Sequence, residues 1–311
     1  MSNLERDPQE IRCATGVGAE AEVLTGREVL TGREVPLGGP RAMTVSRTLP
    51  GVRRRMIGAW CFVDAYGPER AVMRVPPHPH TGLQTVSWLI AGEVLHRDSL
   101  GTLREVRPGQ LNLMTAGRGI SHSEESAAGV LHGVQLWVAL PGAHRHTSPA
   151  FEHHPSLPVL SGSGFEATVV MGSLGGVSSP ATAYSPLVGA EVAVDGSCEV
   201  PLDLGYEHGL LLLNGEVAEL GRGPLTYLPP GLSGVRLSGR GRVLLIGGEP
   251  FSEEIVMWWN FVGRSHDEIA AYRKEWMEGE GFGAVEGFDG APLPAPVLPG
   301  IRLKPRGRVR E

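Results

Sequence analysis

The chain has 311 residues, of which 41% are hydrophobic, so it can build one large or two modest domains around a buried core. Glycine (44 residues) and proline (25 residues) are abundant, which favours many short elements joined by turns and therefore a β-rich protein. The net charge of −6 gives no support for direct nucleic-acid binding.

Cysteine usage and hydropathy indicate a cytoplasmic protein. Cys13, Cys61 and Cys198 lie far apart and form no CxxC pair, so we expect reduced thiols. The opening residues, MSNLERDPQEIRC, contain no hydrophobic core of a secretory signal. No run of about 18 apolar residues is present, so no membrane contact is expected.

Residues 1–40 are interpreted as an N-terminal arm. The hexapeptide EVLTGR occurs at 22–27 and again at 28–33. A short repeat that occurs only twice does not predict a solenoid. We expect a loose arm or an additional hairpin turn that takes no part in chemistry.

Residues 41–155 predict a first β domain. Short segments that alternate in polarity or are wholly apolar follow one another, each bounded by Gly, Pro or Asp. They include AMTVSRTLP, AWCFVDAYGP, EVRPGQLNLMTAG and LHGVQLWVALPG. No convincing helical period appears before residue 264.

Residues 156–285 repeat the pattern of the first domain. Two pairs of segments match in the same order, GLLLLNGEVAEL (209–220) with VSWLIAGEVLHR (86–97), and GPLTYLPPG (223–231) with RPGQLNLMTAG (107–117). They indicate two similar β-barrels in tandem, with a junction around residues 153–164. His208 stands alone in the second copy where the first has a histidine pair, so only the first barrel is expected to bind a metal.

The segment RSHDEIAAYRKEWMEG predicts one short C-terminal helix. Ser265 and Glu268 have the spacing of a capping box, and Ile269 and Trp276 share one helical face. Residues 286–311 form a Pro-rich, basic tail that we expect to run extended over the surface.

Two pairs of residues suggest a metal site in the first barrel. His78 and His80 stand at i and i+2 at the start of a strand, so their side chains point to the same side of a sheet. His122 and Glu124, in TAGRGISHSEES, have the same spacing. If the two segments are adjacent, three imidazoles and one carboxylate converge on a single ion.

The mixed nitrogen and oxygen donors suit Fe(II) best, with Mn, Ni, Co, Cu or Zn as alternatives. No thiolate is present in the set, which argues against a structural zinc site. Four protein ligands leave two positions of an octahedral ion for water, O2 or substrate. His96 is expected to be hydrogen-bonded within its own turn, and Glu125 to point away from the site.

The run HPHTGLQTVSWLIAGEVLHRDSLG, followed by RPGQLNLMTAGRGISHSE, resembles the N-terminal signature of the pirin family in the cupin superfamily. AMTVSRTLP and VQLWVALP match further family landmarks, and the resemblance covers most of residues 40–285. It implies an all-β bicupin, two tandem jelly-roll barrels with a short C-terminal helix and metal only in the N-terminal barrel.

The resemblance also places the metal ligands. The family's ligands carry over to His78, His80, His122 and Glu124, the same four side chains that the spacing suggests. Members of the family often have Glu at the position of Gln84, so we expect Gln84 to lie in the shell around the ligands.

Two functions follow from the resemblance. Bacterial pirin-like proteins are associated with quercetin 2,3-dioxygenase activity, in which a flavonol-like aromatic substrate is cleaved by O2 and Glu124 would be both ligand and catalytic base. The alternative is a non-enzymatic, iron-binding redox sensor that acts through contact with a protein partner. A structural bicupin with an incidental metal is a third reading. The chain has no GxxxxGK[ST] motif and no βαβ alternation, which disfavours nucleotide-binding enzymes.

Overall fold

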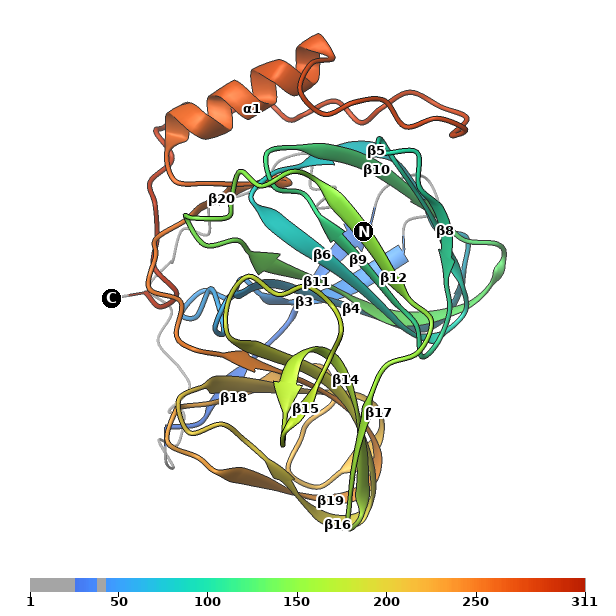
Figure 1. The fold of residues 1–311 in the computed structure, drawn as a ribbon, viewed down its shortest axis with the longest axis vertical. Helices are drawn as coiled ribbons and strands as arrows, with labels where there is room; N and C mark the ends of the chain where they lie inside the picture. The colour runs from blue at the N-terminus through green and yellow to red at the C-terminus, as the bar shows by residue number, and fades with distance from the viewer. Residues whose placement is uncertain (1–25, 38–42, 311) are drawn as a thin grey trace.

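A computed structural model describes residues 26–37 and 43–310 (Figure 1). Strands account for 54% of the residues and helix for 5%, and two cupin barrels are stacked on one another. The prediction of an all-β bicupin with one short C-terminal helix is therefore confirmed.

The first barrel is made of a seven-stranded and a four-stranded antiparallel sheet. Its strands are β2 (Arg33–Leu37), β3 (Met43–Leu49), β4 (Trp60–Ala71), β5 (Arg74–His80), β6 (Leu83–Ala91), β7 (Val94–Asp98), β8 (Leu103–Val106), β9 (Leu111–Thr115), β10 (Ile120–Glu125), β11 (Gly129–Ala139) and β12 (Ala150–His154). The larger sheet has the order β12-β9-β6-β11-β4-β3-β2, and the smaller has the order β5-β10-β7-β8.

The second barrel is built from an eight-stranded sheet. Its strands are β1 (Glu28–Leu30), β13 (Val159–Gly162), β14 (Phe165–Leu174), β15 (Val177–Ser178), β16 (Leu187–Pro201), β17 (Glu207–Val217), β18 (Leu225–Leu228) and β19 (Gly234–Gly248). The order is β1-β18-β17-β19-β16-β14-β13, and β15 pairs with β14.

The central strands β6, β9 and β11 of the larger sheet are buried on both faces, which explains their nearly unbroken apolar runs. In β6, Val86 and Trp88 contact the second barrel, while Ser87 on the other face points into the first barrel. The core between the barrels draws on both, namely on Trp60, Val63, Val86, Trp88, Leu136 and Val138 from the first and on Val170, Met171, Leu187, Leu211, Leu244 and Ile246 from the second. One continuous apolar core therefore joins the two barrels.

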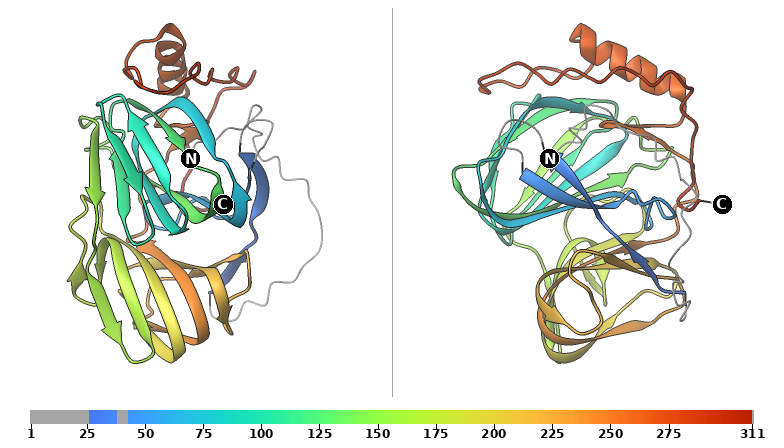
Figure 2. Two further views of the ribbon diagram at one scale, coloured as in Figure 1. Left: turned by 90° about the vertical axis from the view of Figure 1, so that its right-hand side faces the viewer. Right: turned by 180° about the vertical axis from the view of Figure 1, so that it is seen from behind.

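The described part of the N-terminal arm crosses from one barrel to the other, as Figure 2 shows. β1 pairs with β18 of the second barrel, and β2 pairs with β3 of the first. The second EVLTGR copy thus supplies one strand and the start of another, which do not pair with each other. The expected loose arm or hairpin turn is wrong for residues 28–33, and most of the first copy lies outside the described residues.

The chain after residue 249 returns to the first barrel. A small hairpin, β20 (Val256–Trp258) with β21 (Phe261–Gly263), is followed by the helix α1 (His266–Glu278). β21 lies against β5, and α1 packs on the hairpin at the end of the molecule that carries the first barrel (Figure 1). Val262 belongs to an apolar cluster of the first barrel, together with Leu83 and Trp137. The end of the segment 156–285 therefore packs against the first barrel as well as following the strands of the second.

α1 begins at the residue that the sequence indicates. The Ser265 side chain accepts a hydrogen bond from the Glu268 backbone N–H at 3.2 Å. The Glu268 carboxylate accepts from the N–H of Arg264 instead of closing the box on Ser265, and it also pairs with Arg145 of the first barrel. The cap thus helps to attach α1 to that barrel.

A buried carboxylate joins the barrels and the C-terminal tail. Glu207 accepts hydrogen bonds from the backbone N–H of Gly58 at 2.7 Å and from Arg308 at 2.7 Å. Arg54 and the Tyr227 hydroxyl, at 3.4 and 3.1 Å, also donate to it. Three distant parts of the sequence therefore depend on one side chain for their relative position.

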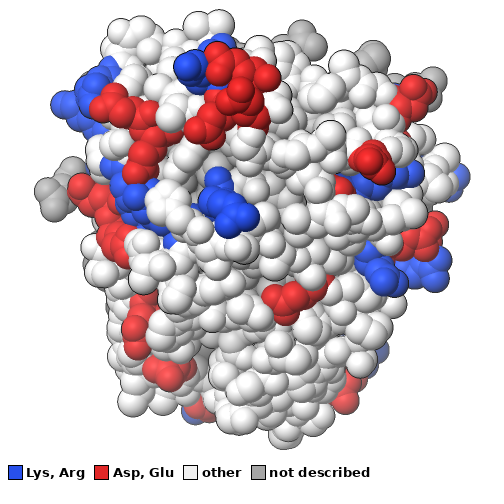
Figure 3. Space-filling view, turned by 45° about the horizontal axis from the view of Figure 1, so that its top comes forward, with Lys and Arg blue, Asp and Glu red and all other residues white. Residues whose placement is uncertain are grey.

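Among the described residues, no helix is long and apolar enough to cross a membrane. On the face that carries α1, acidic and basic side chains lie next to one another (Figure 3). Arg302 of the tail, for example, pairs with Asp267 of α1 at 2.6 Å.

Candidate metal centre

β5 and β10 place the two predicted residue pairs on neighbouring strands. The antiparallel register puts His78 directly opposite His122, with His80 opposite Ile120. Between His122 and Glu124 the register shifts, because β5 has one more residue than β10 over this stretch. Pro76 and Pro77 occupy the shift, where proline's missing N–H breaks the regular ladder.

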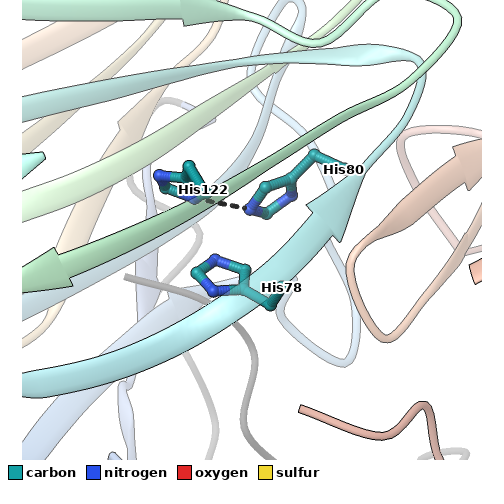
Figure 4. A group of neighbouring side chains, drawn as sticks. All are labelled: His78, His80 and His122. Carbon is teal, nitrogen blue, oxygen red and sulfur yellow. Dashed lines mark hydrogen bonds between the residues drawn. The ribbon is translucent and has the colours of Figure 1, made fainter. Parts of the chain in front are cut away.

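The three imidazoles meet inside the barrel (Figure 4). The ring centres of His78 and His122 are 4.3 Å apart, and those of His80 and His122 are 5.0 Å apart. The Nε2 atoms of His80 and His122 are separated by 3.1 Å. One nitrogen from each of the three side chains lies within 4.8 Å of the others, which is a spacing that one metal ion can bridge.

Backbone carbonyls determine which nitrogens face the centre. The Nδ1 atom of His78 lies 2.8 Å from the carbonyl oxygen of Pro76, and Nδ1 of His80 lies 3.2 Å from that of Asn260. A carbonyl only accepts, so both Nδ1 atoms carry the proton and both Nε2 atoms have a lone pair for a metal. Nε2 of His78 is buried without a hydrogen-bond partner among the described residues.

The third imidazole is held by side chains. Nδ1 of His122 lies 3.3 Å from Nδ1 of His96, and Nε2 of His96 lies 3.0 Å from the Asp98 carboxylate. Burial opposes ionisation of Asp98, but the hydrogen bonds from His96 and Thr102 lower its pKa below the usual value. All three side chains of this chain of contacts are buried.

Glu124 lies beside the imidazoles but on the His96 side. Its carboxylate is within 4.8 Å of nitrogens of His96 and His122, whereas the compact group of three imidazoles does not include it. The Ser87 hydroxyl lies 3.3 Å from Oε1 of Glu124 and 3.0 Å from Oε1 of Gln135. The structure therefore brings all four predicted residues to one site, with the carboxylate at its margin.

Burial keeps the imidazoles neutral. It lowers the pKa of His78 to about 3, and it lowers the pKa values of His80 and His122 well below the ordinary value. Neutral imidazole is the form that binds a metal, because the protonated ring has no lone pair. Burial also raises the pKa of Tyr66, with the negative charge of Glu124 adding to the effect.

The sequence did not reveal that His96 and Asp98 belong to the site, and it predicted the wrong place for Gln84. His96 does hydrogen-bond near its turn, but it also contacts His122, and its i, i+2 spacing to Asp98 could have revealed the pair. Gln84 faces away from the imidazoles: it donates to the Thr115 hydroxyl and to the carbonyl of Thr182 in the second barrel. Its expected place around the ligands is therefore wrong.

The second barrel has no comparable group among its described residues. His208 shares a strand face with Leu210 and Leu212 in the apolar interior, and burial lowers its pKa to about 4. Its two ring nitrogens have no described hydrogen-bond partner, and no set of three metal-binding side chains includes it.

Comparisons with known proteins agree with this architecture. The family model described as Pirin matches residues 42–138, and the Pirin C-terminal cupin domain matches residues 190–283. A protein of Pseudomonas aeruginosa, provisionally named a quercetin 2,3-dioxygenase, is 47% identical over 83% of this chain and 86% of its own length. A pirin-like protein of Caulobacter vibrioides is 34% identical over 76% of this chain and 88% of its own.

A solved structure is also similar over nearly the full length. The crystal structure of a quercetin 2,3-dioxygenase from Acinetobacter baumannii superposes with a TM-score of 0.85 at 40% identity, covering 89% of this chain and 97% of that one. The two family models, the relatives and the shared bicupin fold lead to one conclusion: this chain belongs to the pirin family.

Proposed function

We propose that this protein is a metal-dependent dioxygenase that cleaves a flavonol-like substrate with O2, in the manner of a quercetin 2,3-dioxygenase. The observation that carries the proposal is the convergence of three neutral, buried imidazoles beside a buried carboxylate. Relatives at 47% and 40% identity carry the name of this activity, which supports the choice of reaction.

The residues present fit a divalent metal ion. Nε2 of His78 is a buried polar atom without a described partner, and leaving such an atom unpaired costs about 1–3 kcal/mol. We propose His78, His80, His122 and Glu124 as its ligands and Fe(II) as the resident ion, because imidazole with carboxylate suits that metal. The ion, when bound, would act as a Lewis acid that holds a substrate oxygen and lowers its pKa.

Glu124 would serve as the base for the substrate. A flavonol has an acidic hydroxyl beside its carbonyl, and the carboxylate of Glu124 would take that proton. The hydroxyl of Ser87 lies 3.3 Å from Oε1 of Glu124 and 3.0 Å from Oε1 of Gln135, and donating its one proton to Glu124 would orient the carboxylate. The surrounding barrel keeps these groups from bulk water, which strengthens each interaction.

The test combines metal analysis with turnover. Protein purified without chelators is analysed for metal, loaded with Fe(II) and mixed aerobically with quercetin and other flavonols, while absorbance and O2 uptake are followed. We expect turnover by the unaltered protein and its loss in Glu124→Gln, which keeps shape but removes the base. Glu125→Gln is the matched control, because Glu125 points outward to Arg74 and Arg97.

Two outcomes would overturn the proposal. Full turnover by Glu124→Gln would remove the role of the carboxylate. Iron-loaded protein that retains its metal but converts none of the flavonols would exclude the dioxygenase and leave the redox-sensing regulator as the reading to examine.

A further inference from the structure

His96 and Asp98 lie on β7, next to the strand that carries His122. The register places Asp98 opposite His122 and His96 opposite Glu124, so all four side chains face the interior. Asp98, His96 and His122 form an unbroken line of contacts of 3.0 and 3.3 Å. The ring of His96 also stacks on Phe151, with centres 4.6 Å apart, which restricts its orientation.

We propose that the His96–Asp98 pair is a positioning device that fixes the tautomer of His122. An ionised carboxylate can only accept, so Nε2 of His96 carries the proton and Nδ1 of His96 has the lone pair. Nδ1 of His122, which faces that lone pair, must then be the donor. Nε2 of His122 is left unprotonated and turned toward His80, where the metal would bind. The inference rests on the proposed metal centre.

The turn that follows β7 fixes the orientation of the Asp98 carboxylate, so the effect of replacing Asp98 by Asn on the tautomer of His96 can be predicted. Oδ1 of Asp98 accepts the backbone N–H groups of Leu100 and Thr102, at 2.9 and 3.0 Å, while Oδ2 faces His96. In Asp98→Asn the amide oxygen must stay with the two backbone donors, so the amide NH2 takes the place of Oδ2. It then donates to Nε2 of His96, which moves the proton of that ring to Nδ1. Two N–H groups would then face each other between His96 and His122.

Tautomers can be read directly in metal-free protein. In histidine-labelled protein near neutral pH, long-range proton–nitrogen NMR distinguishes Nδ1–H from Nε2–H rings. We expect Nε2–H for His96 and Nδ1–H for His122 in the unaltered chain, and Nδ1–H for His96 in Asp98→Asn. The opposite tautomers in the unaltered chain would overturn the inference without any variant, as would an unchanged His96 ring in Asp98→Asn.

The effect of this tautomer change on metal binding is measured as the Zn(II) affinity, by competition with a chelator. We expect Asp98→Asn to bind about 10- to 100-fold more weakly, the usual effect of losing a partner behind a metal ligand. Asp203→Asn is the matched control, because Asp203 accepts the N–H of Gly205 in a turn of the second barrel. Equal affinity of Asp98→Asn and the unaltered protein would overturn the inference.

A third variant separates this inference from the metal centre itself. His122→Ala removes the proposed ligand, so its Zn(II) affinity should fall further than that of Asp98→Asn. If His122→Ala binds as well as the unaltered protein, the metal centre is wrong and the positioning role falls with it. If only Asp98→Asn is without effect, the metal centre stands and the positioning role alone is refuted.

Discussion

Replacing Glu207 by Gln should loosen the joint between the two barrels and the C-terminal tail. The side chain of Glu207 is fully buried, and every group bonded to its carboxylate is a donor, namely the N–H of Gly58, the guanidinium groups of Arg54 and Arg308, and the hydroxyl of Tyr227. Glutamine keeps the shape, but its NH2 end must face donors and the charge opposite the arginines is lost.

The magnitude follows from what remains around the arginines. Removing one partner of a buried ion pair costs about 3–5 kcal/mol. Arg54 keeps a second carboxylate, Glu28, at 2.6 Å, and the side chain of Arg308 is 34% exposed, so the lower end applies. We expect a loss of about 3 kcal/mol, which corresponds to a decrease in Tm of about 5 °C for a chain of 311 residues.

Thermal and urea unfolding of the two proteins measure this loss. Glu199→Gln is the matched control, because Glu199 and its partner Arg236 are 60% and 84% exposed and such a pair contributes less than about 1 kcal/mol. If Glu207→Gln lowers Tm no more than Glu199→Gln does, the network around Glu207 contributes no more than a surface pair, and the reasoning fails.

Three further predictions concern pH, thiols and the C-terminal segment. Burial lowers the pKa of His78 from an ordinary 6.5 to about 3, so on acidification the unfolded chain binds this proton before the folded protein does. Proton binding to the unfolded state should therefore lower the free energy of unfolding of the metal-free protein by about 2 kcal/mol between pH 7 and pH 5. Urea unfolding at both pH values measures the loss, which His78→Gln should reduce; equal stability at both would contradict it. Burial raises the pKa of Cys61 to about 12 and also raises that of Cys198, so native Cys13→Ser protein should not react with a thiol reagent until denaturant exposes two thiols. Rapid labelling of the native variant would show this burial to be wrong. Phe282→Ala should lower the free energy of unfolding by about 3–5 kcal/mol, because it removes a buried ring, and it should weaken Zn(II) binding, because that ring anchors the segment whose backbone carbonyl at residue 282 accepts the N–H of Ser121 beside His122. Exposed Val297→Ala should change neither quantity. Unaltered Zn(II) affinity in Phe282→Ala would show that the C-terminal segment does not contribute to metal binding.

The sequence determined the local features of the protein. Alternation in the short segments predicted strands, and the i, i+2 spacing of His78 with His80 was enough to place both rings on one side of β5. The Ser265 cap and the apolar face of Ile269 predicted α1 to within a residue or so. These features depend on neighbours a few positions away, so no knowledge of the rest of the chain was needed.

The tertiary structure decided which distant segments meet. The register of β7 against β10 brings His96 and Asp98 to His122, and the register shift at Pro76–Pro77 sets where Glu124 lies relative to His78. The carbonyl of Asn260, 180 residues along the chain, orients His80. Strand pairing and packing between distant segments fix these contacts, and a single sequence contains no periodic signal for them. The sequence by itself therefore determined which residue types could form a metal centre, whereas only the packing of the barrel, the returning C-terminal segment and the buried His96–Asp98 pair decided how they are held.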